Sequence, residues 1–157
     1  MNLEEEEYVH LVSCIASLNE AWNILHNVKK SHSKSLVNPA FQFALIEYSK
    51  PYKKSYDEVK RIHKLGNEHI SSKHLDLHNK IIKARDRVHA HSDLTVDDAK
   101  VYVTNTFYGK HVGIAKNVIY DTEMIGEIDA VIDLIEKSLD SMYIKVKQLE
   151  SALPFHS

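Results

Sequence analysis

Apolar residues recur every three or four positions along several stretches of the chain, which is the period of an amphipathic helix. The first stretch covers residues 3–31, with a stripe made of Leu11, Ile15, Leu18, Trp22 and Leu25. The last begins near Thr122 and has the longest stripe, made of Ile125, Ile128, Ile132, Ile135, Leu139, Met142, Val146 and Leu149. Because each stripe needs a neighbouring helix, we expect these two long helices to pack against each other in a bundle.

Two further helices are predicted between them. Asn38-Pro39 offers an N-cap followed by a proline at the first helical position, so a second helix is expected over residues 39–49, and Pro51 ends it. Ser72 is a suitable N-cap for a helix over residues 73–90, whose stripe consists of Leu77, Ile81, Ala84 and Val88.

The stretch between these two helices, residues 52–71, is harder to interpret. Tyr52, Tyr56, Val59 and Ile62 are helically spaced, but Gly66-Asn67 breaks the run, so we expect a short irregular helix and a loop. This is also the most basic part of the chain, with Lys50, Lys53, Lys54, Lys60, Arg61 and Lys64. The charge fits an RNA-facing surface, although an ordinary solvated face is the commoner explanation of such a stretch.

A β-hairpin is predicted before the last helix. Residues 100–107 and 111–120 are rich in Val, Thr and Tyr, and Tyr108-Gly109-Lys110 separates them. The predicted fold is therefore mainly α: an antiparallel bundle of four to five helices with a small β-hairpin inserted before the last long helix. At 157 residues we expect a single domain spanning residues 1–157.

The amino-acid composition bears on the expected location of the protein and on its expected partners. The single cysteine, Cys14, lies in an apolar helical pattern, so it is expected to be a core residue and not a nucleophile, and a cytoplasmic location is expected. No run of apolar residues is long enough to predict a membrane span, and no signal peptide is expected. The formal net charge of −2 gives no global attraction for nucleic acid, so RNA binding would require a local basic patch.

Candidate chemistry is concentrated at the end of the helix over residues 73–90. Arg85 and His91 form an Arg-x5-His pair with Asp86 directly after the arginine, in the string Ala-Arg-Asp-Arg-Val-His-Ala-His-Ser-Asp-Leu. This string resembles the R-x(4–6)-H signature of the HEPN superfamily (higher eukaryotes and prokaryotes nucleotide-binding domains), and its abortive-infection U branch in particular. The resemblance implies an all-α bundle and a metal-independent endoribonuclease that acts as a homodimer, with no cofactor.

The resemblance also assigns roles to residues. Arg85 and His91 match the motif as phosphate or transition-state stabiliser and as general acid/base. Asp86 occupies the polar position and completes the expected catalytic set by orienting either Arg85 or a histidine ring nitrogen. Arg87, His89 and Ser92 are auxiliary candidates: Arg87 and His89 have no counterpart in the motif, and Arg87 lies one turn before His91.

The residue types suit metal-free RNA cleavage, which needs a base for the 2′-hydroxyl, an acid for the leaving oxygen and positive charge for the phosphorane. Histidine titrates near neutral pH, and arginine binds phosphate through two hydrogen bonds. Arg85 and His91 lie about 120° apart around an ideal helix, so one chain makes a poor site. In the family two copies meet at a dimer axis, which would combine both motifs in one cleft.

Other interpretations remain open. His74-x3-His78 has a spacing used by zinc sites, but no third ligand is obvious and no metal is expected. His91 could instead cap the core at the end of the apolar stripe. The motif could also belong to a non-catalytic HEPN-like module that binds a nucleotide, nucleic acid or protein. RNA is the expected substrate or ligand, an antitoxin protein is a candidate partner, and stress or phage defence is the expected context.

Overall fold

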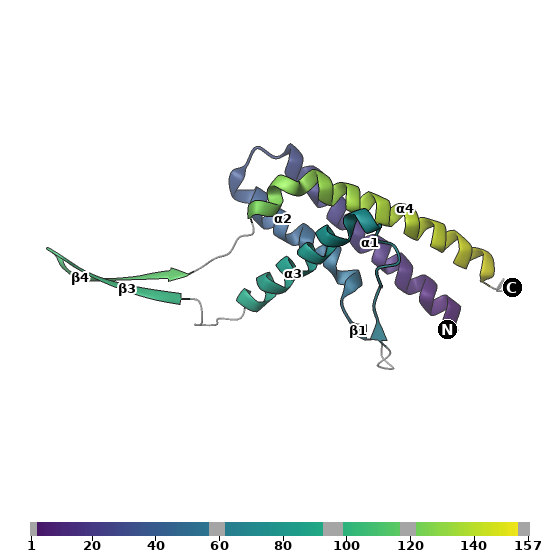
Figure 1. Cartoon of the computed structure of the whole chain (residues 1–157), viewed down its shortest axis with the longest axis horizontal. Helices are drawn as coiled ribbons and strands as arrows, with labels where there is room; N and C mark the ends of the chain where they lie inside the picture. Colours follow the sequence, from purple (N-terminus) through teal and green to yellow (C-terminus); the bar gives the residue numbers. More distant parts are fainter. Residues whose placement is uncertain (1–2, 57–61, 93–98, 117–121, 154–157) are drawn as a thin grey trace.

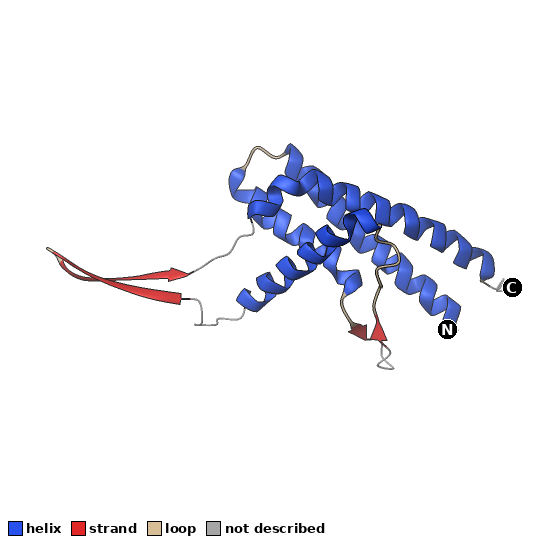
Figure 2. Cartoon of the chain, viewed as in Figure 1, coloured by secondary structure: helices blue, strands red, loops and turns tan. Residues whose placement is uncertain are grey.

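The computed structural model describes residues 3–56, 62–92, 99–116 and 122–153. Four α-helices carry most of these residues, and a two-stranded hairpin precedes the last of them (Figures 1 and 2). In chain order the elements are α1 (Leu3–Lys30), α2 (Lys34–Ser49), the 3-10 helix η1 (Lys50–Tyr52), β1 (Ser55–Tyr56), β2 (Ile62–His63), η2 (Ser72–His74), α3 (Leu75–Ser92), β3 (Ala99–Thr106), β4 (Gly109–Lys116), η3 (Thr122–Glu127) and α4 (Ile128–Ala152). The predicted mainly α architecture is confirmed.

The two long helices pack against each other as the sequence predicts. α1 lies along α4, α2 packs on α1, and α3 packs on α2 (Figure 1). On α1, Leu18 and Leu25 are fully buried, and on α4 Ile135 and Met142 are fully buried. Trp22 is only partly buried, and its Nε1 donates a hydrogen bond of 2.9 Å to Glu136 on α4. The apolar stripes therefore form the seam between the two helices.

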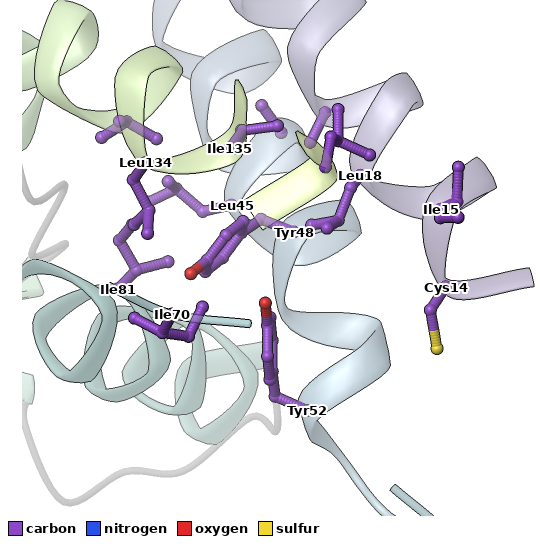
Figure 3. Packing of buried hydrophobic residues seen from close by; sticks show 14 of the residues in the cluster. Cys14, Ile15, Leu18, Leu45, Tyr48, Tyr52, Ile70, Ile81, Leu134 and Ile135 are labelled. Atoms are coloured by element: carbon purple, nitrogen blue, oxygen red, sulfur yellow. The ribbon is translucent and has the colours of Figure 1, made fainter. Parts of the chain in front are cut away.

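The centre of the core lies where α2 and α3 meet this pair of helices. Tyr48 on α2 is fully buried, and it lies close to Leu45, Ile81 and Leu134 in Figure 3. The ring of Tyr52 in η1 stacks obliquely on Tyr48, with a centroid distance of 5.4 Å. Burial raises the pKa values of both phenols well above the ordinary value of 10, so both side chains stay neutral.

The predicted start of the second helix is wrong. α2 begins at Lys34 with Ser33 as its N-cap, and Pro39 lies inside it instead of at its first position. The N–H of Val37 donates to the carbonyl of Ser33, which closes the first helical turn before the proline is reached. Leu36 and Val37 belong to this added first turn and line an apolar groove between α1 and α2.

The short helix predicted within residues 52–71 is also wrong for the described part of that stretch. Tyr56 and Ile62, which share helical spacing in the sequence, instead face each other across the short antiparallel β1–β2 pair. Val59 lies outside the described residues. Leu65 and Ile70 reach the core from an irregular segment, so buried apolar residues here do not require a helix.

The predicted hairpin is confirmed, with its turn one residue earlier than expected. Thr106 pairs with Gly109 at the end of the ladder, so Phe107 and Tyr108 form a two-residue turn. Gly109 has a φ of +116°, which glycine adopts without steric cost. The last helix also differs at its start, because residues 122–127 form the 3-10 helix η3 and α4 begins at Ile128. None of the described helices is long and apolar enough to span a membrane.

Candidate functional site on the motif helix

The helix that carries the motif is α3, which is preceded by η2 and ends at Ser92, two residues later than predicted. One side of α3 faces the core: Ile81 and Ala84 are buried, and so are His74 in η2 and His78. Ser71 caps η2 in place of the predicted Ser72. Arg85 follows Ala84 directly, and this puts its side chain at the edge of the buried face.

Asp86 holds two cationic side chains in a cluster that we call the Lys53–Asp86–Arg85 clasp. Its Oδ1 accepts a hydrogen bond of 3.2 Å from the Arg85 guanidinium, and its Oδ2 accepts one of 2.7 Å from Lys53 Nζ. Lys53 comes from the segment directly after η1. The Lys53 ammonium, followed by Arg85, holds the pKa of the Asp86 carboxyl below its ordinary value of 3.8. Asp86 is therefore an ionised positioning group near neutral pH and not a proton donor.

The guanidinium of Arg85 uses only some of its N–H groups in this clasp. The side chain is 24% exposed, and its Nε is buried without a hydrogen-bond partner among the described residues. A buried donor that lacks an acceptor costs about 1–3 kcal/mol. A phosphate that approaches from solvent meets the accessible N–H groups of the planar fork, and it reaches Nε only if the side chain shifts.

A surface hollow lies one to two turns before the clasp on α3. Its volume is about 430 Å³, and it is lined by Tyr52, Lys64, Leu65, Gly66, Asn67, His78, Asn79 and Ile82. Lys64 supplies positive charge at the rim, and Asn67 and Asn79 supply amide groups. The hollow is next to the clasp in sequence at two points, because Ile82 precedes Arg85 by three positions and Tyr52 precedes Lys53. It therefore extends the candidate site along the motif helix.

His78 is a buried histidine in the lining of this hollow. Its Nδ1 shares a hydrogen bond of 2.8 Å with the hydroxyl of Tyr48, and its ring meets the Tyr52 ring edge to face. Burial, and secondarily the charge of Lys64, lower the pKa of His78 below its ordinary value of 6.5. The imidazole is therefore neutral at pH 7 and stays in a fixed orientation.

The histidine pair considered as a zinc site has other partners. His74 shares hydrogen bonds with Ser71 Oγ at 2.9 Å and with Asp133 Oδ2 at 3.0 Å, and these contacts tie η2 to α4. His78 is held by Tyr48 instead. Within the described ranges, no group of three or more His, Cys, Asp or Glu side chains is arranged to hold a metal ion.

The structure brings together only some of the residues singled out in the sequence. Arg85 and Asp86 are in contact, as the motif implies. Arg87, His89, His91 and Ser92 lie on the last turns of α3, and their side chains lie outside the described part of the structure. Their distances to Arg85 are therefore not part of the site geometry.

Cys14 is buried as the sequence predicts. Burial raises the pKa of its thiol to about 11, so it is protonated and a poor nucleophile at neutral pH.

Two members of the site were not identified as site residues from the sequence. Lys53 was noted only as part of a basic stretch, and its contact with Asp86 joins residues 33 positions apart. His78 was considered only as a metal ligand. Its separation of seven positions from Arg85 is close to two full helical turns, which places both residues on the same side of α3 and could have linked them.

Comparisons with protein-family profiles, with curated proteins and with solved structures gave no match. The class of the protein therefore has to be argued from the motif and from the geometry around it.

Proposed function

We propose that the chain is a HEPN-type, metal-independent endoribonuclease that acts as a homodimer in the cytoplasm, with a role in stress or phage defence. In this proposal Arg85 binds the scissile phosphate and stabilises its transition state, and His91 transfers the proton. The observation that carries the proposal is the Lys53–Asp86–Arg85 clasp, in which Asp86 orients the guanidinium while its buried Nε stays without a partner in the described residues.

The clasp supports a phosphate-binding role on physical grounds. Arg85 and Lys53 together carry two positive charges, and Asp86 neutralises only one, so the cluster keeps a net positive charge for an anionic ligand. The neighbouring hollow, with Lys64 at its rim and the amides of Asn67 and Asn79, offers further hydrogen-bonding groups for a nucleotide. RNA is the proposed substrate because the 2′-hydroxyl supplies the nucleophile that a metal-free mechanism needs.

The proposal predicts that the two copies join their α3 helices across a two-fold axis. Arg85 and His91 diverge by about 120° on one helix, so a site that uses both is completed by the second copy. An antitoxin protein that covers the motif helix would be the matching regulatory partner.

The proposed function is tested by RNA cleavage with His91→Ala beside the wild type, in EDTA and with structured RNA. Loss of a general acid/base lowers the rate by about 10²–10⁴-fold. RNA affinity should change little, because one hydrogen bond is lost. His89→Ala serves as the matched control on the same helix and should have a milder effect. Equal activity of wild type and His91→Ala would contradict the proposed role of His91.

A non-catalytic binding module is the second candidate, and one observation favours it. The described part of the clasp consists of two cations and the ionised Asp86, so it offers positive charge for an anion but no proton-transfer group. If wild-type protein binds RNA, a nucleotide or a protein at this cluster and never cleaves RNA, and the substitutions change affinity alone, the binding module is the correct assignment.

A further inference from the structure

The β3–β4 hairpin extends beyond the end of α3 and away from the helices, as Figure 1 shows. Every side chain described within it, from residue 101 to residue 113, is exposed. A two-stranded hairpin is marginally stable at best in water when nothing covers it. The arrangement therefore indicates an arm whose stabilising contacts come from outside its own bundle.

The tip of this arm exposes two aromatic rings. Phe107 is 98% exposed and Tyr108 is 91% exposed, and their rings contact each other edge to face at a centroid distance of 5.6 Å. Two-residue hairpin turns favour Asn and Gly at these positions, and here Gly109 and the bond from Thr106 Oγ1 to the Gly109 carbonyl already form the turn. Turn chemistry does not explain the aromatics, whereas aromatic side chains are the commonest anchors of protein interfaces.

One face of the arm is apolar as well. Val103 pairs with Val112 in the ladder, and Val101 lies on the same face two residues before Val103. All three valines are more than half exposed. Stacking and phosphate contacts with nucleic acid would leave this face uncovered, whereas another protein surface would bury it.

The helical bundle of the same chain has an unfilled apolar groove, which is a candidate receiving surface for the arm. It lies between α1 and α2, has a volume of about 350 Å³, and is lined mainly by Ile24, Val28, Leu36, Val37, Ala40 and Phe43. Leu36 is 65% exposed and Phe43 is 49% exposed. A cavity of this size accepts small organic ligands, so an aromatic side chain fits within it.

We propose that the arm of one copy docks on a second copy of this chain, with Phe107 and Tyr108 seated in the partner's α1–α2 groove. A two-fold axis makes the exchange reciprocal, so two tips fill two grooves and the assembly closes as a dimer. The inference rests on the proposed function in one respect, because both require a dimer. Docking of the arm does not require RNA cleavage.

Buried area and charge both favour a second copy as the occupant. Two aromatic side chains bury about 300–500 Å² in each arm. Two arms and their valine faces then approach the roughly 1,200–2,000 Å² of a stable interface. The hairpin residues 99–116 contain three lysines and no acidic residue, whereas the remaining 139 residues contain 17 lysines and arginines against 22 acidic residues, a net charge of −5. The arm and the rest of a second copy therefore carry net charges of opposite sign, while the groove itself is lined by no charged residue.

The test measures the dimer dissociation constant by sedimentation equilibrium. The tip variant Phe107→Ser/Tyr108→Ser and the groove variant Leu36→Ser/Phe43→Ser should each weaken the dimer by at least about 30-fold, the size expected for interface anchors. Ile144→Ser removes a comparably exposed apolar side chain from α4 and should leave the dimer unchanged. All substituted side chains are about half exposed or more, so thermal unfolding should show that the bundle stays folded.

Mixing the two defective proteins decides whether the tip meets the groove. In a mixed dimer the intact tip of the groove variant meets the intact groove of the tip variant, so one of the two contacts is restored and the mixture should dimerise more tightly than either variant alone. A monomeric wild type, an unchanged tip variant, or a mixture without recovery overturns the proposal. The proposal is also overturned if the tip variant dimerises like the wild type but binds RNA more weakly. That result assigns the arm to nucleic acid. If the dimer forms through the arm but RNA is never cleaved, the proposed function fails and the arm exchange stands.

Discussion

At the residue scale, Lys53 and Arg85 share the carboxylate of Asp86, and this sharing determines how the candidate site should respond to substitution. The Lys53 and Arg85 side chains are both partly buried, but the Arg85 guanidinium also has a buried Nε, so its orientation depends more on Asp86. The Asp86 carboxyl is half exposed, so solvent screens the pair and its contribution to fold stability is small. Its main effect is on the position of Arg85.

Arg85→Ala should lower RNA affinity by roughly 10–100-fold, because charge-assisted hydrogen bonds contribute about 1.5–3 kcal/mol each. The cleavage rate should fall further, since charge on the phosphate grows toward the transition state. Fluorescence anisotropy with labelled RNA and a gel-based cleavage assay measure the two effects. Lys83→Ala is the matched control, because it removes an exposed cation from the same helix. Equal losses in both variants would mean that Arg85 contributes only general positive charge.

His78 gives a pH-dependent prediction. Its pKa in the folded protein lies below 6.5, so the unfolded chain takes up the proton first as the pH falls. The contribution of neutral His78 to stability is therefore complete above about pH 6.5 and declines as the pH falls through the window down to the folded pKa. Urea unfolding at pH 5 and pH 7.5 should show a smaller stability difference for His78→Gln than for the wild type. His32→Gln, at an exposed position in the turn between α1 and α2, should retain the wild-type difference. An equal effect of both substitutions would contradict the account of His78.

At the element scale, periodic burial explains which parts of the fold could be predicted. The apolar stripes of α1 and α4 repeat over many turns, so a few residues that depart from the pattern do not hide it. Both helices, and their packing against each other, were therefore predicted. The start of α2 was missed because the first helical turn closes between Ser33 and Val37, before the local signal at Asn38-Pro39 is reached. The β1–β2 pair was missed because two residues per strand are too few to show alternation.

The candidate site was predictable to a similar extent. Arg85 and Asp86 are adjacent in the motif, so their contact follows from the sequence. The Lys53 contact forms only because η1 turns the chain back toward α3, and the hollow beside His78 depends on the irregular segment around Gly66. Both features depend on tertiary structure and carry no local pattern.

The position of Pro39 inside α2 gives a prediction for helix stability. Proline in a helix interior removes one backbone hydrogen bond and crowds the preceding turn, at a cost of about 3 kcal/mol. Loss of proline also gives the unfolded chain more freedom, which offsets about 0.4–1 kcal/mol. Pro39→Ala should therefore stabilise the protein by roughly 1–2 kcal/mol in urea unfolding, less than the full difference because the helix already accommodates the ring.

Pro51→Ala is the control for that substitution. Pro51 is buried and occupies one of the first positions of η1, where the missing N–H has no helical acceptor. Its replacement should be neutral or destabilising. If the two alanine variants change the free energy of unfolding in the same direction by the same amount, the interior position of Pro39 has no special cost.

At the scale of the whole molecule, the proposals converge on a dimer. In the proposed function two α3 helices bring Arg85 and His91 together, and in the proposed arm exchange a second copy covers the exposed hairpin. The hairpin follows α3 in the chain and extends beyond its end in Figure 1, so a two-fold axis near the end of α3 would direct each arm toward the other copy. One arrangement of two copies could satisfy both requirements.

The most direct test of the proposed function is the chemistry of the RNA ends after incubation with wild-type protein in excess EDTA. Attack of the 2′-oxygen on the phosphorus, with cleavage of the P–O5′ bond and protonation of the leaving 5′-oxygen, needs no metal. It predicts 5′-hydroxyl fragments and 2′,3′-cyclic phosphate ends, at a rate unchanged by the chelator. Activity that disappears in EDTA and returns with zinc or magnesium, or wild-type protein that binds RNA and leaves it intact, would contradict the proposal.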